Sequence, residues 1–134
     1  MTEPLWSTYE PQFTRQEFAC KCGCNRADMT PGFMDRLRTL RSLYGEPLPV
    51  TSGFRCSKHN AKVSTTGPNG PHTTGQAADM LIFGADALTL VVLASRIGFT
   101  GVGCSQKGPV NSRFLHLDDL SQTATRPRPW LWTY

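Results

Sequence analysis

Apolar side chains recur at helical spacing in two stretches of the chain. In the first stretch Thr30 precedes Pro31, and Gly45 follows the last apolar position, as expected for an N-cap, a first helical residue and a left-handed C-cap. The core-facing stripe of this helix, over residues 31–44, comprises Phe33, Met34, Leu37, Leu40, Leu43 and Tyr44. The second stretch predicts a helix over residues 85–97, with Leu88, Val91, Val92 and Ser95 near one side.

Shorter apolar segments predict the strands of a sheet. We expect a short strand at residues 48–52 and a central strand at residues 76–83. Residues 101–104 and 114–117 are joined by a short polar loop, which favours an antiparallel pair. Residues 57–71 are rich in Ser, Thr, Asn, Gly and Pro without an apolar period, so they predict a long loop of the kind that is often functional.

The two ends of the chain lack periodicity. Residues 1–12 predict an N-terminal arm lying on the domain, after which Thr14 and Glu17 have the spacing of a capping box that begins a short helix. Residues 121–134 form a proline-broken, aromatic tail, which we expect to pack on the domain; a partner-binding peptide is the alternative. Without internal repeats or a linker, the sequence predicts one domain over residues 1–134.

The net charge of +4 suggests an anionic partner, such as nucleic acid, a membrane surface or an acidic cell-wall polymer. The Lys and Arg residues are scattered, which fits an ordinary basic surface equally well and argues against a nucleic-acid binder. No apolar run approaches the roughly 20 residues that cross a bilayer, and the first residues lack a signal-peptide pattern. We therefore expect the protein to be made in the cytoplasm and not to insert into a membrane.

The sequence has five cysteines, so at least one is unpaired within a monomer. Cys20, Cys22 and Cys24 alternate with other residues, and Cys56 lies downstream. This spacing differs from the C-x₂₋₄-C pattern usual for structural zinc. Three states stay open: a structural zinc site that includes Cys56, one disulfide from the cluster to Cys56, or free thiols. Cys104 is expected to be free, and the lack of a signal argues against obligatory disulfides.

One carboxylate and two imidazoles predict a metal site. Asp79 is a charge inside an apolar strand, where an unpaired carboxylate is very costly. His72 precedes Asp79 by seven positions, at the end of the loop over residues 57–71, and His116 lies in the last apolar segment. Catalytic zinc is commonly held by three such ligands, which leaves a fourth position for a water whose pKa falls to about 7. Each histidine taken alone also fits a hydrogen-bonded structural role.

Five segments between about residues 13 and 120 carry a further signal. They are Phe18-Ala19-Cys20-Lys21-Cys22-Gly23-Cys24, Ser52-Gly53-Phe54-Arg55-Cys56, His59-Asn60, His72-x₆-Asp79 with Gly75 and Ala78, and Phe114-Leu115-His116-Leu117-Asp118. In this order they resemble the zinc D-alanyl-D-alanine peptidase family, particularly its small phage and bacterial members. The resemblance implies an α+β fold of the hedgehog/DD-peptidase type, in which a central antiparallel sheet carries the metal and helices pack on one side.

The resemblance also implies roles for individual residues. The ligands of one zinc ion per chain would be His72, Asp79 and His116. Arg55, in the Ser-Gly-x-Arg motif, would bind the substrate carboxylate or stabilise the oxyanion, because its guanidinium is always charged and carries five donors. Substrate-binding residues beside it would be Ser52 and Asn60.

The general base is where this chain departs from the family pattern. Many members place an acidic residue three positions before the last histidine, whereas this chain has Arg113 there. The small members share the His-x-Asp ending instead, which makes Asp118 the candidate catalytic base. An inactive relative that keeps the metal is the alternative.

The implied function is a zinc metallopeptidase that hydrolyses amide bonds in the peptide stems of bacterial peptidoglycan. The DD- and LD-type carboxypeptidases and endopeptidases of the family all remain open. We expect a monomeric phage-type endolysin, made in the host cytoplasm and released to the cell wall through a holin-type pore. The alternative from another class is a non-catalytic, zinc-stabilised cell-wall-binding or virion structural module of the same fold.

Overall fold

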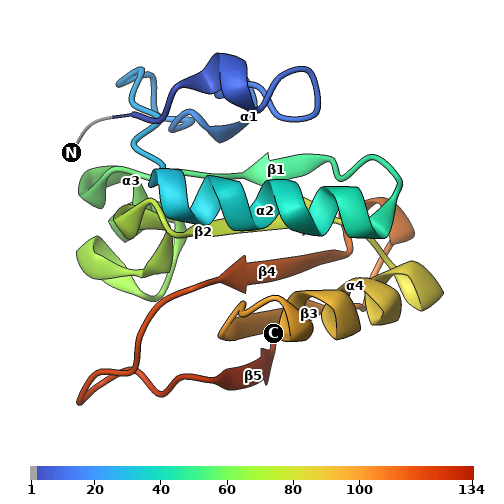
Figure 1. The fold of residues 1–134 in the computed structure, drawn as a ribbon. Helices are drawn as coiled ribbons and strands as arrows, with labels where there is room; N and C mark the ends of the chain where they lie inside the picture. Colours follow the sequence, from blue (N-terminus) through green and yellow to red (C-terminus); the bar gives the residue numbers. More distant parts are fainter. Residues whose placement is uncertain (1–2) are drawn as a thin grey trace.

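A five-stranded sheet forms the centre of the structure, a computed structural model that describes residues 3–134 (Figure 1). In chain order the strands are β1 (Val50–Ser52), β2 (Ala77–Leu81), β3 (Gly101–Ser105), β4 (Phe114–Asp118) and β5 (Trp130–Thr133). Their spatial order is β1-β2-β4-β3-β5. The first three pairings are antiparallel, and β5 runs parallel to β3 at the edge. The predicted α+β class is confirmed, with a parallel edge strand added to the antiparallel centre.

The two longest helices cover one face of this sheet (Figure 1). The helices are α1 (Arg15–Phe18), α2 (Pro31–Tyr44), α3 (Ser57–Val63) and α4 (Gly84–Arg96). Short 3-10 turns connect them: η1 (Trp6–Thr8), η2 (Gly67–Asn69), η3 (Pro71–Thr74) and η4 (Val110–Ser112). Within the described residues, no helix combines the length and the apolar character that crossing a membrane requires.

The predicted ends of α2 are confirmed. Thr30 Oγ1 accepts a hydrogen bond from the backbone N–H of Phe33 at 3.2 Å, and Gly45 adopts a left-handed φ of 82°. Leu43, which the apolar stripe included, is 56% exposed. The buried side chains of α2 are Phe33, Met34, Leu37 and Leu40.

The side of α4 that carries Leu88 and Val92 is not the side that packs. Leu88 is 68% exposed and Val92 is 46% exposed, while the buried residues of the helix are Ala87, Leu90 and Ala94. Because α4 carries apolar side chains around most of its circumference, the spacing alone did not select the face that packs. The small alanines let the helix lie close to the sheet and to α2.

Part of the predicted loop over residues 57–71 is helical. α3 begins after Cys56, whose Sγ accepts a hydrogen bond from the backbone N–H of His59 at 3.4 Å. This side chain takes the place of the Ser, Thr, Asp or Asn that usually caps a helix. α3 and η3 hold the chain before β2 in a fixed path, which ends at the first metal candidate.

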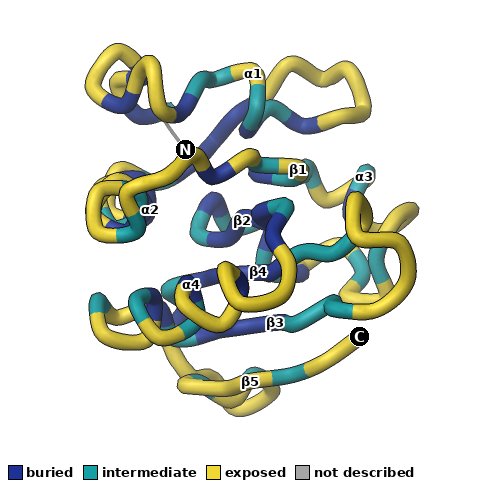
Figure 2. The backbone as a smooth tube through the Cα atoms, turned by 90° about the vertical axis from the view of Figure 1, so that its right-hand side faces the viewer, coloured by how far each residue is buried: buried dark blue, intermediate teal, exposed yellow. Residues whose placement is uncertain are grey.

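The two faces of the central strands differ in character. Ala78 and Met80 of β2 and Leu115 and Leu117 of β4 belong to the core beneath α2 and α4. The alternate residues Asp79 and His116 are direct partners in the β2–β4 register, on the face away from those helices. Figure 2 shows that these central strands are buried, whereas β5 is largely exposed. The sheet therefore places a carboxylate beside an imidazole on its second face.

Both ends of the described chain lie against the domain. In the predicted N-terminal arm, whose residues 1–2 lie outside the described residues, Trp6 packs on Phe18 with ring centroids 5.4 Å apart. The expected capping box is present, because Glu17 Oε1 accepts from the backbone N–H of Thr14 at 2.9 Å. In the tail over residues 121–134, strand β5 pairs with β3.

Candidate metal centre

Three separate elements bring the predicted ligands together. His72 lies in η3, Asp79 in the middle of β2 and His116 in the middle of β4, and all three side chains are buried. Asp79 Oδ1 lies 3.2 Å from His72 Nε2 and 3.2 Å from His116 Nδ1. The two imidazole nitrogens lie 3.3 Å from each other. These atoms form a nearly equilateral triangle at the surface of the sheet.

The size of this triangle fits tetrahedral zinc. Bonds of about 2.0–2.1 Å from zinc to nitrogen and oxygen place neighbouring ligand atoms about 3.4 Å apart. The three observed separations of 3.2, 3.2 and 3.3 Å are close to that value. Two imidazoles and one carboxylate are also a donor set that catalytic zinc sites use. The residues present therefore fit the metal that the sequence predicts.

Hydrogen bonds behind the two imidazoles orient their lone pairs toward one point. His72 Nδ1 lies 2.7 Å from the carbonyl oxygen of Gly53, so it carries the proton and donates. His116 Nε2 lies 2.8 Å from Asp118 Oδ2, which assigns the second proton in the same way. The facing nitrogens and Asp79 Oδ1 are then three acceptors in mutual contact. Such a group requires a cation between its members.

The electrostatics of the buried groups lead to the same conclusion. Burial opposes ionisation of Asp79, yet the imidazoles of His116 and His72 together hold its pKa below the usual range. Burial also disfavours a charged His116, but hydrogen bonds to Asp118 and Asp79 outweigh this and raise its pKa. The centre thus stabilises positive charge, which a proton or a metal ion can supply.

Arg55 is held beside the metal candidates by three interactions. Its Nε–H donates to Ser52 Oγ at 3.1 Å, and its Nη1 donates to Asn60 Oδ1 at 3.1 Å. Its Nη2 lies 3.6 Å from Asp79 Oδ2, the carboxylate oxygen outside the ligand triangle. The guanidinium is therefore fixed in orientation and borders the site.

Ser52 and Asn60 lie behind Arg55 rather than in the cleft. Asn60 is fully buried, and its Nδ2 donates to Thr66 Oγ1 and to the Gly67 carbonyl oxygen. Neither Ser52 nor Asn60 lines the cleft over the site. The structure thus favours a positioning role for both residues over the direct substrate contact that the resemblance implied.

Asp118 lies on the far side of His116 from the ligand triangle. It is fully buried, and Arg128 donates to both of its oxygens, from Nε at 2.9 Å and from Nη2 at 2.8 Å. Although burial raises the pKa of this carboxyl, the hydrogen bonds from His116 and Arg128 lower it to about 2. A general base must reach the proton that it removes. This placement corrects the predicted role: Asp118 orients His116 instead of facing the cleft.

Arg113, at the usual position of the acid, also lies outside the site. Its Nε–H donates to the carbonyl oxygen of Gly108 at 3.0 Å. Arg113 does not line the cleft. This residue is therefore a surface feature of the turn before β4.

Two tail residues that support the centre were missed by the sequence reasoning. Arg128 neutralises Asp118, and the Trp132 ring lies 5.0 Å from the His116 ring, centroid to centroid. The tail carries no local pattern that links it to a histidine motif. Trp132 thus comes from a strand whose pairing is long-range in sequence, and Arg128 from the segment that leads into that strand.

Two glycines of β3 provide the space that the side chains of Asp118 and Trp132 occupy. A Cβ on Gly101 would collide with the Asp118 carboxylate, and one on Gly103 would collide with the Trp132 ring. The Gly-Val-Gly pattern of this strand was the available indication, because glycine within a strand often marks a close approach.

A cleft of about 750 Å³ opens over the metal candidates. It runs between residues 63–71 and the tail, and among the described residues that line it Asp79 has the only side-chain carboxylate. Its basic residues are Arg55, Arg126 and Arg128, and its aromatic residues are Phe114, Trp130, Trp132 and Tyr134. With a divalent cation on the floor, this cleft is positively charged and suits an anionic ligand.

The orientation of His116 by Asp118 can be tested with Asp118→Asn. An asparagine accepts less strongly from His116 and leaves Arg128 without its charge partner, so we expect zinc affinity to fall about 10- to 100-fold. Turnover at saturating zinc should be largely retained, because Asp118 does not face the cleft. Zinc titration by competition with a chromogenic chelator, combined with rates at saturating zinc, measures both quantities.

Asp119→Asn is the matched control, since its carboxylate contacts Gln76 and Arg36 rather than His116. If Asp118→Asn lowers the rate at saturating zinc while zinc affinity is unchanged, the residue acts on the reacting atoms and the positioning role is wrong.

A protein-family model described as Peptidase M15 matches residues 11–118. The matched range contains the three ligand candidates, Arg55 and Asp118, while Arg128 and β5 lie beyond it. No curated protein matches the chain.

Proposed function

Since the chain belongs to the peptidase M15 family, we propose that it is a zinc-dependent peptidase that hydrolyses amide bonds in the peptide stems of bacterial peptidoglycan. The family is that of zinc metallopeptidases, and the α+β architecture agrees with its DD-peptidase-type fold. The observation that carries the proposal is the triangle of His72, Asp79 and His116 on the floor of an open cleft.

The ligand set and Arg55 divide the chemistry between them. A zinc ion held by His72, Asp79 and His116 would polarise the scissile carbonyl and lower the pKa of a water molecule to about 7. Arg55 would offset the negative charge that develops on the carbonyl oxygen, because its guanidinium is fixed next to the ligand triangle.

The charge of the cleft supports a stem peptide as the substrate. Peptidoglycan stems carry free carboxylates, and the cleft offers Arg126 together with Arg55 on its walls. The aromatic side chains of β5 add a flat wall against which a short, extended peptide can lie. A phage-type endolysin role, with release through a holin-type pore, follows from the resemblance to small phage members and from the net charge of +4.

The test is turbidity loss of purified, outer-membrane-stripped sacculi, followed by mass analysis of the released peptides. We expect lysis that a chelator abolishes and that added zinc restores, and the fragment masses identify the bond that is cut. Failure to release any peptide, from protein that contains zinc in the cleft, contradicts the proposal.

The second candidate is a non-catalytic, zinc-stabilised module that binds the cell wall. The specific observation in its favour is that the described residues lining the cleft offer no side-chain carboxylate besides Asp79, since Asp118 is turned away and Arg113 replaces the usual acid. This candidate predicts that the protein co-sediments with sacculi without releasing peptides, and that removal of zinc unfolds it.

A further inference from the structure

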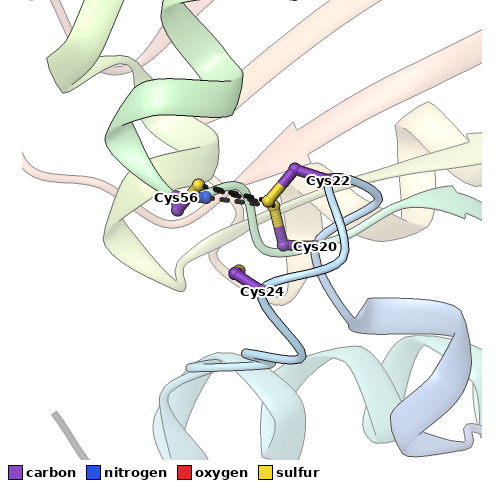
Figure 3. A group of neighbouring side chains, drawn as sticks. All are labelled: Cys20, Cys22, Cys24 and Cys56. Atoms are coloured by element: carbon purple, nitrogen blue, oxygen red, sulfur yellow. Dashed lines mark hydrogen bonds between the residues drawn. The ribbon is translucent and has the colours of Figure 1, made fainter.

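The four cysteines Cys20, Cys22, Cys24 and Cys56 gather at one place outside the cleft (Figure 3). Cys20 Sγ lies 3.5 Å from Cys22 Sγ and 3.8 Å from Cys56 Sγ, and Cys22 Sγ lies 3.6 Å from Cys56 Sγ. The sulfur of Cys24 completes the group, in which all four atoms lie within 4.8 Å of one another.

These separations fit a shared metal ion better than a disulfide. Tetrahedral zinc with sulfur ligands at about 2.3 Å places neighbouring sulfurs about 3.8 Å apart. A disulfide requires about 2.05 Å between two sulfurs and leaves the other thiols unused. The observed values of 3.5, 3.6 and 3.8 Å lie near the zinc geometry.

The local backbone builds this arrangement from alternating cysteines. Gly23, between Cys22 and Cys24, and Asn25, directly after Cys24, adopt left-handed φ values of 91° and 60°, so the chain turns sharply at both positions. The backbone N–H of Cys20 donates to the carbonyl oxygen of Arg26 at 2.7 Å and closes the loop. Three thiols of a C-x-C-x-C segment therefore face one side, although the spacing is unusual for a zinc site.

Backbone N–H groups donate hydrogen bonds to two of the sulfurs and would stabilise them as thiolates. The N–H of Cys56 donates to Cys20 Sγ at 3.4 Å, and the N–H of His59 donates to Cys56 Sγ at 3.4 Å. In the sequence Lys21 separates Cys20 from Cys22, and Lys58 follows Cys56 by two positions. Cys20 is buried and Cys22 and Cys24 are exposed, so the site is anchored in the protein and open to an incoming ion.

We propose that Cys20, Cys22, Cys24 and Cys56 bind a second, structural zinc ion as four thiolates, each thiol releasing its proton to solvent. Four protein ligands leave no open coordination position, so this ion takes no direct part in hydrolysis. Its place in the fold gives it a mechanical role: Cys56 directly follows Arg55, and the loop over residues 20–26 belongs to the N-terminal part of the chain. The ion would tie these two segments together and fix the backbone that carries Arg55.

The backbone next to the cluster already links the same two segments. The N–H of Phe54 donates to the carbonyl oxygen of Phe18 at 2.8 Å, and the guanidinium carbon of Arg26 lies 5.0 Å from the Phe54 ring centroid. A zinc ion bound by the four cysteines would strengthen this contact between the two segments at its solvent-exposed side. The proposal does not depend on the chemistry of the cleft.

The test is the zinc content of the full-length protein, purified under reducing conditions and measured by plasma mass spectrometry. We expect two zinc ions per chain, and one in each of the variants Cys22→Ser and His116→Ala, which remove different sites. The combination of both substitutions should contain none. Cobalt substitution of His116→Ala should give the intense visible absorption of tetrahedral cobalt thiolate.

Cys104→Ser is the matched control, because Cys104 lies in β3 outside the cluster, and it should retain two zinc ions. If Cys22→Ser does not fold, protection of four thiols from alkylation by zinc in the unaltered protein still tests the site. One zinc per chain in the unaltered protein, unchanged in Cys22→Ser, overturns the proposal. So does recovery of a Cys20–Cys56 disulfide under the same reducing conditions.

Discussion

Replacement of His116 by alanine is expected to remove zinc from the cleft and to lower peptide release from sacculi by at least about 10³-fold. Loss of a single electrostatic donor at an active site typically costs about 10²- to 10³-fold in rate, and His116→Ala removes a ligand of the ion on which the whole reaction depends. The substitution also leaves Asp118 without its imidazole partner and Trp132 without the ring that it packs against.

The measurement compares the rate of peptide release with the zinc content of the same samples. His59→Ala is the matched control, because the third histidine lies in α3 and does not line the cleft. It should retain both activity and cleft zinc. If His116→Ala is inactive but binds cleft zinc as tightly as the unaltered protein, His116 is not a ligand and the assignment of the centre is wrong.

The second large effect is expected for Arg55→Ala, with turnover lower by about 10²- to 10³-fold and cleft zinc retained. Arg55 lies 3.6 Å from Asp79 Oδ2 but outside the ligand triangle, so its loss removes a positive charge from the reacting centre without removing a ligand. Arg55→Lys should recover only part of the rate, because an ammonium cannot reproduce the simultaneous contacts of the guanidinium with Ser52 and Asn60.

Arg113→Ala is the control for loss of one arginine and should leave the rate unchanged, since the Arg113 side chain donates to Gly108 in the turn before β4 and does not line the cleft. Steady-state rates on a soluble stem-peptide substrate, with zinc content measured in parallel, separate the two possible effects. Full activity of Arg55→Ala would show that the residue has no role in turnover. Loss of zinc from Arg55→Ala would show that it supports Asp79 structurally instead.

The features that the sequence predicted well are those that short segments encode. The ends of α2 follow from Thr30 and Gly45, whose side-chain cap and left-handed φ act within one helical turn. The strand that contains Asp79 was recognisable from its apolar residues, and the charge inside that strand indicated a binding partner. Three ligand candidates read from spacing and chemistry are indeed within 3.3 Å of one another.

The features that it missed depend on contacts between distant segments. The inner face of α4 is selected by the shape of the sheet and α2, since the helix itself offers apolar residues on several sides. Strand alternation puts Asp118 on the same face of β4 as His116. The hydrogen bonds from Arg128 to Asp118 depend on the path of the tail that leads into β5, which no local pattern indicates.

The direct pairing of Asp79 with His116 across β2 and β4 has a consequence for how the sheet folds. Side chains alternate along a strand, so a slip of one residue between these strands would send the carboxylate and the imidazole to opposite faces. A slipped sheet could not bind the ion, and zinc would add its binding free energy to the native pairing alone. Zinc would thus stabilise the native strand register selectively, and the yield of folded protein in the cell would depend on zinc supply.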